Sequence, residues 1–149
     1  MTLETIIALC LLATAPYPDR DTPARYATCH EVASKAAHGG VDPVLMVALA
    51  VEESNLRADV VSSRGAVGPL QVMPEHWCGG AGCLDPVASG LRAVQGWRER
   101  YGSAWLCHYN AGNVCGDRSR RYARRIKRRA VSWRARLALA GVEERERGE

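Results

Sequence analysis

Three helix-start signals divide this chain into helical segments. Each is a Thr or an Asp followed directly by Pro: Thr22-Pro23, Asp42-Pro43 and Asp85-Pro86. The side-chain oxygen of Thr or Asp can accept hydrogen bonds from the free N–H groups of a first helical turn. Proline suits the first helical position because its missing N–H would have no partner there. We therefore expect several helices joined by loops.

The apolar residues recur at helical spacing after these starts. The expected helices cover residues 23–37, 43–55, part of 71–77, 86–102, about 103–109 (with Ser103 as the cap) and 119–140. Residues 57–68 are rich in Ser and Gly and are expected to form a loop. No stretch of useful length alternates polar and apolar residues as a strand would. We expect a mainly α-helical single domain over residues 21–140, followed by a charged tail over 141–149.

The first 20 residues form an apolar N-terminal segment that is either a cleaved signal peptide or an uncut helix. Residues 6–13 are an apolar run, and Ala13-Thr14-Ala15 resembles a signal-peptidase site. However, Glu4 precedes the run without any Lys or Arg, and Pro16 follows the site. Removal of residues 1–15 would also leave an odd number of cysteines. A cleaved signal and an uncut helix packed on the domain both remain open, and the run is too short for an ordinary membrane span.

Six cysteines in 149 residues favour disulfides over metal binding. They are Cys10, Cys29, Cys78, Cys83, Cys107 and Cys115. None forms a Cys-x-x-Cys pair and no His has ligand spacing to two of them, so we expect no metal and no cofactor. Cys78 and Cys83 bracket a glycine-rich loop, and Cys107 and Cys115 bracket a turn, which suggests two local pairings among many possible ones. Disulfides indicate an oxidising compartment or an extracellular particle.

The positive charge of the chain is concentrated near its C-terminal end. The formal net charge is +4, and residues 118–136 contain ten Lys or Arg. Such a helix either has a solvated face or binds an anionic partner, namely a wall polymer, a membrane surface or nucleic acid. No DNA-binding motif accompanies it, so we expect no specific nucleic acid. A wall polymer or a membrane surface is the preferred partner.

Two separated blocks carry the strongest functional signal. Residues 51–74 read VEESNLRADVVSSRGAVGPLQVMP, and residues 105–112 read WLCHYNAG. In this order they resemble the signature of lytic transglycosylases related to goose-type lysozyme. The matching residues are Glu53-Ser54, Ser62, Gly65-Ala66, Gly68, Gln71, Met73-Pro74 and Tyr109-Asn110-Ala111-Gly112, with Tyr122 and Ile126 resembling the closing helix. Pro69 and Leu70 replace the Leu-Met of the family, which we expect to alter the groove wall beside Gln71.

The resemblance implies a lysozyme-like domain that cleaves the MurNAc–GlcNAc β-1,4 bond of peptidoglycan and forms 1,6-anhydro-MurNAc. It implies that Glu53 acts first as an acid and then as a base. A carboxyl can remain protonated near neutral pH when apolar neighbours bury it, and Glu53 follows Leu45 and Leu49 at helical spacing. Periodicity alone does not separate Glu53 from Glu52. The register to Ser62 and Gln71 favours Glu53, and Glu52 is the alternative.

The resemblance also implies substrate-binding roles for Ser62, Gln71, Met73, Tyr109 and Asn110. Tyr109 would lie beside Glu53, with its hydroxyl near the carboxyl or the sugar. The structural alternatives are a core position for Tyr109 and Met73, a turn or helix cap for Gln71 and above all for Ser62, and a turn for Asn110. The expected setting is periplasmic, secreted or virion-associated, as a monomer unless it is part of a larger particle. A hydrolytic lysozyme or phage endolysin acting on the same bond, or an inactive wall-binding module, are the alternatives.

Overall fold

The computed structural model describes residues 1–79 and 82–141, and it confirms a mainly helical fold. The helices are α1 (Leu3–Thr14), α2 (Thr22–His38), α3 (Pro43–Ser54), α4 (Pro74–Trp77), α5 (Pro86–Tyr101), the 3-10 helix η1 (Gly102–Ala104), α6 (Trp105–Ala111) and α7 (Asp117–Leu139). Within the described residues, β-type pairing is limited to two isolated bridges that join Val67 to Val61 and to Val72. All but Gly141 of the expected tail lies outside the described residues.

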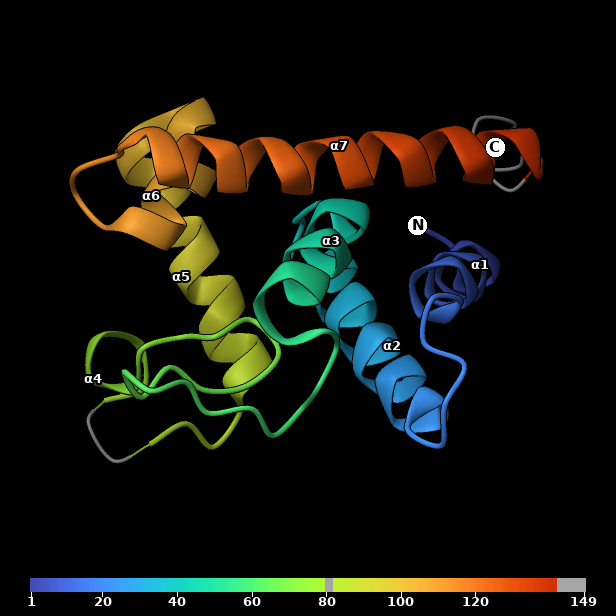
Figure 1. The fold of residues 1–149 in the computed structure, drawn as a ribbon, viewed down its shortest axis with the longest axis horizontal. Coiled ribbons are helices and arrows are strands. Elements are labelled where there is room, and N and C mark those ends of the chain that lie inside the picture. The colour runs from blue at the N-terminus through green and yellow to red at the C-terminus, as the bar shows by residue number, and fades with distance from the viewer. Residues whose placement is uncertain (80–81, 142–149) are drawn as a thin grey trace.

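Helix α3 is the centre of the fold. It packs against α2 on one side and against α7, which runs along one edge of the molecule (Figure 1). Residues 46–50 of α3 are fully buried. Helices α5 and α6 pack together at one end of α7, and α1 packs at its other end. In this view the loop between α3 and α5, with the short α4, lies at the end of α5 that is farther from α7.

The helix starts follow the sequence signals at two of three positions. Asp42 Oδ1 accepts hydrogen bonds from the backbone N–H groups of Val44 and Leu45, and Asp85 Oδ1 accepts from Ala88. The prediction that Thr22 is an N-cap is wrong by one residue, because Asp21 occupies the cap position and Thr22 is the first helical residue. The Thr22 hydroxyl instead accepts a hydrogen bond from the backbone N–H of Asp19 and donates to backbone carbonyls, so it closes the preceding turn.

The predicted cap at Ser103 is also wrong. Ser103 lies inside η1, and Ala104 precedes α6 without a side-chain hydrogen bond. The physical reason is Gly102, whose φ of +55° ends α5 in a conformation that residues with a side chain rarely adopt. The chain then tightens into a 3-10 turn and enters α6 directly, so no separate capping residue is needed.

Three disulfides connect neighbouring elements. Cys10–Cys29 joins α1 to α2 with a Cα–Cα distance of 5.6 Å. The two local pairings expected from the sequence are present, Cys78–Cys83 at 5.1 Å and Cys107–Cys115 at 5.8 Å. In this structure the N-terminal segment is therefore a helix that packs on the domain, with Leu9 fully buried. Among the described helices, none has the length and apolar character needed to cross a membrane.

Two glycines of α5 let the loop before it pack closely. A Cβ atom on Gly90 would lie 2.7 Å from the side chain of Leu70, and one on Gly96 would lie 2.6 Å from the ring of Trp77. Both distances are shorter than a real Cβ contact, so only glycine fits at either position without a shift of its neighbour. Leu70, one of the two residues that depart from the family pattern, is fully buried as a result.

Candidate active site

Glu53 lies in the last turn of α3, where its half-buried carboxyl faces α7. The pKa of this carboxyl is raised from 4.5 to about 7, chiefly by burial and to a smaller extent by the charge of the adjacent Glu52. A hydrogen bond from the Tyr122 hydroxyl to Glu53 Oε1 lowers the pKa and so opposes these two effects. Because burial dominates, Glu53 is a carboxyl that can hold a proton near neutral pH and can also release it.

Glu52, the alternative acid, has a different environment. Its Oε1 lies 2.7 Å from Arg125 Nη2 and its Oε2 lies 3.2 Å from Arg129 Nη1, and both arginines come from α7. Its side chain is 16% exposed. The carboxylate of Glu52 is therefore the ion-pair partner that joins α3 to α7.

Two tyrosines lie near Glu53, and the one that donates to its carboxyl is Tyr122 and not Tyr109, which the sequence analysis expected beside the carboxyl. Tyr122 of α7 donates to Glu53, whereas the Tyr109 hydroxyl donates to the carbonyl of Leu70 at 2.6 Å. Burial, and secondarily the charge of Glu53, raises the pKa of both hydroxyls well above 10. Both tyrosines therefore remain hydrogen-bond donors. From the sequence, the resemblance of Tyr122 and Ile126 to the closing helix of the family was the one signal that could have identified Tyr122.

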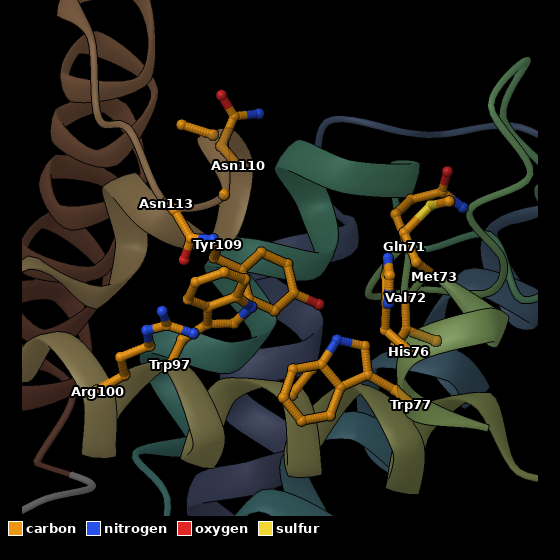
Figure 2. Close-up of a pocket in the computed structure, with 13 residues that line it drawn as sticks. Gln71, Val72, Met73, His76, Trp77, Trp97, Arg100, Tyr109, Asn110 and Asn113 are labelled. Atoms are coloured by element: carbon orange, nitrogen blue, oxygen red, sulfur yellow. The ribbon is translucent and has the colours of Figure 1, made fainter. Parts of the chain in front are cut away.

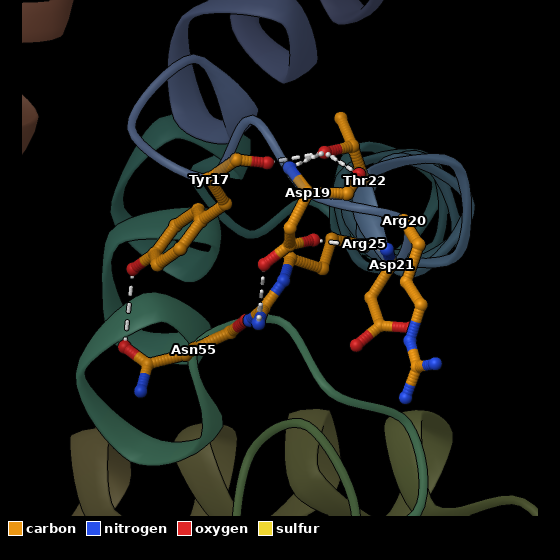
Figure 3. Close-up of polar contacts among 7 residues, drawn as sticks. All are labelled: Tyr17, Asp19, Arg20, Asp21, Thr22, Arg25 and Asn55. Atoms are coloured by element: carbon orange, nitrogen blue, oxygen red, sulfur yellow. Dashed lines mark hydrogen bonds and ion pairs between the residues drawn. The ribbon is translucent and has the colours of Figure 1, made fainter.

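A group of four residues, the Arg25 clamp, holds the turn directly after Glu53. It consists of Tyr17, Asp19, Arg25 and Asn55 (Figure 3). The Arg25 side chain is 5% exposed, and its Nη1 donates to the carbonyl of Asn55 at 2.5 Å. Its guanidinium lies over the Tyr17 ring at 4.5 Å, its Nη2 lies 3.7 Å from Asp19, and the Tyr17 hydroxyl donates to Asn55 Oδ1 at 3.1 Å.

The clamp stabilises an unfavourable backbone conformation. Asn55 and Leu56 have φ values of 51° and 60°, in the left-handed region that non-glycine residues rarely adopt. Arg25 also places a positive charge at the C-terminal end of α3, where the helix dipole favours cations. The position of Glu53, two residues before Asn55, therefore depends on a network that begins in the segment between α1 and α2.

The loop that joins α3 to α4, residues 55–73, is held by polar side chains of its own and by Ser54 at the end of α3. The hydroxyl of Ser54 donates to the carbonyls of Ala50 and Pro69, each at 2.9 Å. The amide nitrogen of Gln71 donates to the carbonyls of Val60 at 3.0 Å and Gly68 at 2.9 Å. The Ser62 hydroxyl accepts from the backbone N–H of Ala66 at 3.0 Å, which is the turn role that the sequence left open.

A cleft of about 510 Å³ opens between α4, α5 and α6. Its lining residues are Gln71, Val72, Met73, His76, Trp77, Ala93, Trp97, Arg100 and residues 109–113. Gln71 and Met73 lie on one side of the cleft in Figure 2, Asn110 on the other, and Tyr109 between them. Four of the five predicted binding residues therefore line one cleft, whereas Ser62 does not. Glu53 is not itself a lining residue of the cleft. Tyr109 lies between Glu53 and the cleft, because it lines the cleft and its hydroxyl is close enough for the charge of Glu53 to raise its pKa.

The two tryptophans of the cleft were not identified from the sequence. Trp77 and Trp97 both line it, and Trp97 stacks on Tyr101 with ring centroids 5.7 Å apart. Flat aromatic rings with a polar edge suit the apolar faces of sugars. Asn110, in contrast, accepts a hydrogen bond from the Ser119 hydroxyl at 2.8 Å and so also connects α6 to α7. The described residues contain no group of three His, Cys, Asp or Glu that could hold a metal ion.

Comparison with known proteins agrees with this geometry. Residues 31–81 match the family described as Transglycosylase SLT domain. This segment, about a third of the chain, spans α3, Glu53 and the loop to Trp77. None of the curated proteins and none of the solved structures matches the chain. Residues 31–81 thus carry the pattern of the Transglycosylase SLT domain family, and the mainly helical structure agrees with the single lysozyme-like domain that this pattern predicts.

Proposed function

We propose that this chain is a peptidoglycan lytic transglycosylase that cleaves the β-1,4 bond between MurNAc and GlcNAc and leaves a 1,6-anhydro-MurNAc end. The observation that carries the proposal is the Glu53 carboxyl, whose pKa burial raises to about 7 and which accepts a hydrogen bond from Tyr122. It lies in the segment that matches a family of peptidoglycan-acting enzymes. One such carboxyl can serve as both acid and base at neutral pH.

In the first step, the protonated Glu53 donates its proton to the glycosidic oxygen as the bond to C1 of MurNAc breaks. The leaving GlcNAc departs with a neutral 4-hydroxyl, which is a far better leaving group than an alkoxide. The N-acetyl group of MurNAc assists at C1 as an internal nucleophile, as the family resemblance implies. The Tyr122 hydroxyl stabilises the Glu53 carboxylate that remains, because it already donates to Oε1.

In the second step, the carboxylate of Glu53 removes the proton from the 6-hydroxyl of MurNAc. The oxygen of this hydroxyl forms a bond to C1 as the bond between C1 and the N-acetyl oxygen breaks, the anhydro ring closes, and Glu53 is again protonated. No water is consumed. Glycoside hydrolases normally use a second carboxylate, whereas Glu52, the acid next to Glu53 in the sequence, is held in ion pairs with Arg125 and Arg129. This supports transglycosylation over hydrolysis.

The cleft is the proposed site for the glycan strand. Gln71, Met73, Tyr109 and Asn110 would contact the sugars, and Trp77 and Trp97 would stack on their apolar faces. Ser62 is assigned to the turn instead. The three disulfides support an extracytoplasmic or virion-associated setting, where peptidoglycan is exposed.

Mass spectrometry of products from purified peptidoglycan tests the proposal. We expect 1,6-anhydro-MurNAc ends from the wild-type chain and none from Glu53→Gln, because glutamine cannot donate the proton. Glu99→Gln, which removes an exposed carboxyl from α5, is the matched control and should retain activity. Reducing MurNAc ends would identify a hydrolytic lysozyme instead. Binding to peptidoglycan without any cleavage would identify a wall-binding module.

A further inference from the structure

The basic residues of α7 fall into two groups that differ in their partners. Arg125 and Arg129 reach back to Glu52, Arg134 reaches Asp42, and Arg120 pairs with Asp117 on its own helix. These arginines stabilise the fold. The remaining ones face solvent, so a structural role does not account for the whole charge of the helix.

We define the outer face of α7 by six residues at alternating spacings of three and four. They are Arg121, Arg124, Arg128, Val131, Ala135 and Ala138. All six are exposed, and they lie on the side of the helix opposite to the buried residues such as Ile126 and Leu137. None of the three arginines has a carboxylate partner among the residues that the structure describes. The outer face therefore presents a row of three unpaired cations.

The row of cations continues into an apolar region. Val131 is 63% exposed, and Leu139, at the last turn of α7, is 89% exposed. Helix α1 packs beside this end of α7 and exposes an apolar stripe at a spacing of four residues, Leu3, Ile7 and Leu11 (Figure 1). Five of the nine large hydrophobic residues exposed in the described chain lie on these two helices. Exposed apolar groups on two helices that pack against each other favour an interaction site at this end of α7.

We propose that the outer face of α7, together with the apolar end formed with α1, docks on an anionic lipid membrane surface. The arginines complement the negative headgroups, and the apolar side chains enter the boundary between headgroups and acyl chains. A wall polymer or a nucleic acid would satisfy the cations and offer no apolar layer to Val131 and Leu139. A second copy of this chain, packed through the same face, would bring no carboxylate to the arginines, because none of the six outer-face residues is acidic.

The position of the cleft is compatible with this docking. Its lining residues come from α4, α5, α6 and the adjoining loops, and none comes from α7. An enzyme held through the outer face of α7 therefore keeps its cleft accessible to a glycan strand. The proposal does not depend on the reaction at Glu53, because the docking residues and the cleft residues do not overlap.

Flotation with lipid vesicles tests the electrostatic part. Vesicles of phosphatidylglycerol mixed with phosphatidylcholine should carry the wild-type chain upward, and vesicles of phosphatidylcholine alone should not. Replacing Arg121, Arg124 and Arg128 together by Gln should weaken binding about a hundredfold, since each arginine near an anionic surface contributes about 1 kcal/mol. The matched control removes three exposed arginines elsewhere: Arg57, Arg64 and Arg98. Equal loss in the two triple variants would overturn the proposal.

A second pair of variants tests the lipid part. Val131→Ser with Leu139→Ser should weaken binding about tenfold. The control exchanges one exposed Leu and one exposed Val that lie outside α1 and α7, Leu84→Ser with Val114→Ser, and should bind as the wild type does. Retained binding of the Val131 and Leu139 double variant, with complete loss of binding at high salt, would overturn lipid docking in favour of a polyanion such as wall polymer or DNA.

Discussion

Replacement of Glu53 by Gln should stabilise the folded protein at neutral and alkaline pH while it removes the proton donor. Burial raises the pKa of this carboxyl from 4.5 to about 7, so the folded chain holds a proton that the unfolded chain releases. The contribution of this carboxyl to stability is fully present below pH 4.5 and is lost as the pH rises through about 7. Glutamine does not ionise, and its carbonyl oxygen can still accept the hydrogen bond from Tyr122.

The magnitude follows from the two pKa values. Between about pH 5 and about pH 8, the ionisation of Glu53 should lower the free energy of unfolding of the wild-type chain by about 2.5 kcal/mol. The Glu53→Gln variant should lose none of this amount, so the difference in stability between variant and wild type should grow with pH. Other titrating groups are common to both proteins and cancel in the comparison.

Urea denaturation at about pH 5 and about pH 8, followed by tryptophan fluorescence, measures the difference in free energy of unfolding between variant and wild type. Glu99→Gln controls for the loss of one acid from the chain. If the free energy of unfolding of Glu53→Gln falls between the two pH values as steeply as that of the wild type, burial does not hold a proton on Glu53. The assignment of this carboxyl as a neutral-pH acid would then lose its physical basis.

Three further predictions test the surroundings of the site. Tyr122→Phe removes the hydrogen bond that lowers the pKa of Glu53, so the alkaline limb of kcat/KM should move to higher pH and kcat should fall about tenfold; an unmoved limb would contradict the contact. Arg25→Met should lower the free energy of unfolding by about 2 kcal/mol and lower kcat more than it changes KM, because it releases the turn after Glu53; urea denaturation and kinetics check this, and an unchanged kcat would refute the clamp. Gly96→Ala should displace the Trp77 ring and raise KM about tenfold, at a cost of about 1 kcal/mol in stability; unchanged kinetics would show that Trp77 does not contact substrate.

The sequence predicted the features that depend on local chemistry. Asp42 and Asp85 cap their helices because a cap and its N–H partners are two or three residues apart, so the pattern is visible in the chain. The Cys78–Cys83 pairing was accessible for the same reason. Glu53 was identified through its sequence spacing to Ser62 and Gln71 in the family pattern, because helix periodicity could not separate it from Glu52.

The sequence could not predict contacts between distant elements. Tyr122 and Glu53 are 69 positions apart, and their contact exists only because α7 crosses α3. The ion pairs of Glu52 depend on the same crossing of α3 and α7, which brings two arginines of α7 to its carboxylate. Tyr109 donates to a backbone carbonyl of the loop because Leu70 packs against α5 at Gly90, and no pattern in the chain specifies that approach.

The inner and outer faces of α7 belong to one rigid helix, so the orientation of one face fixes the orientation of the other. Arg121 on the outer face and Tyr122 on the inner face are consecutive residues, so the hydrogen bond from Tyr122 to Glu53 also fixes the direction in which Arg121 points. A helix that docks through its outer face cannot turn about its axis without breaking this bond. Docking would therefore impose a single orientation of the cleft relative to the surface, and the set of glycan strands within reach would be limited by direction as well as by distance.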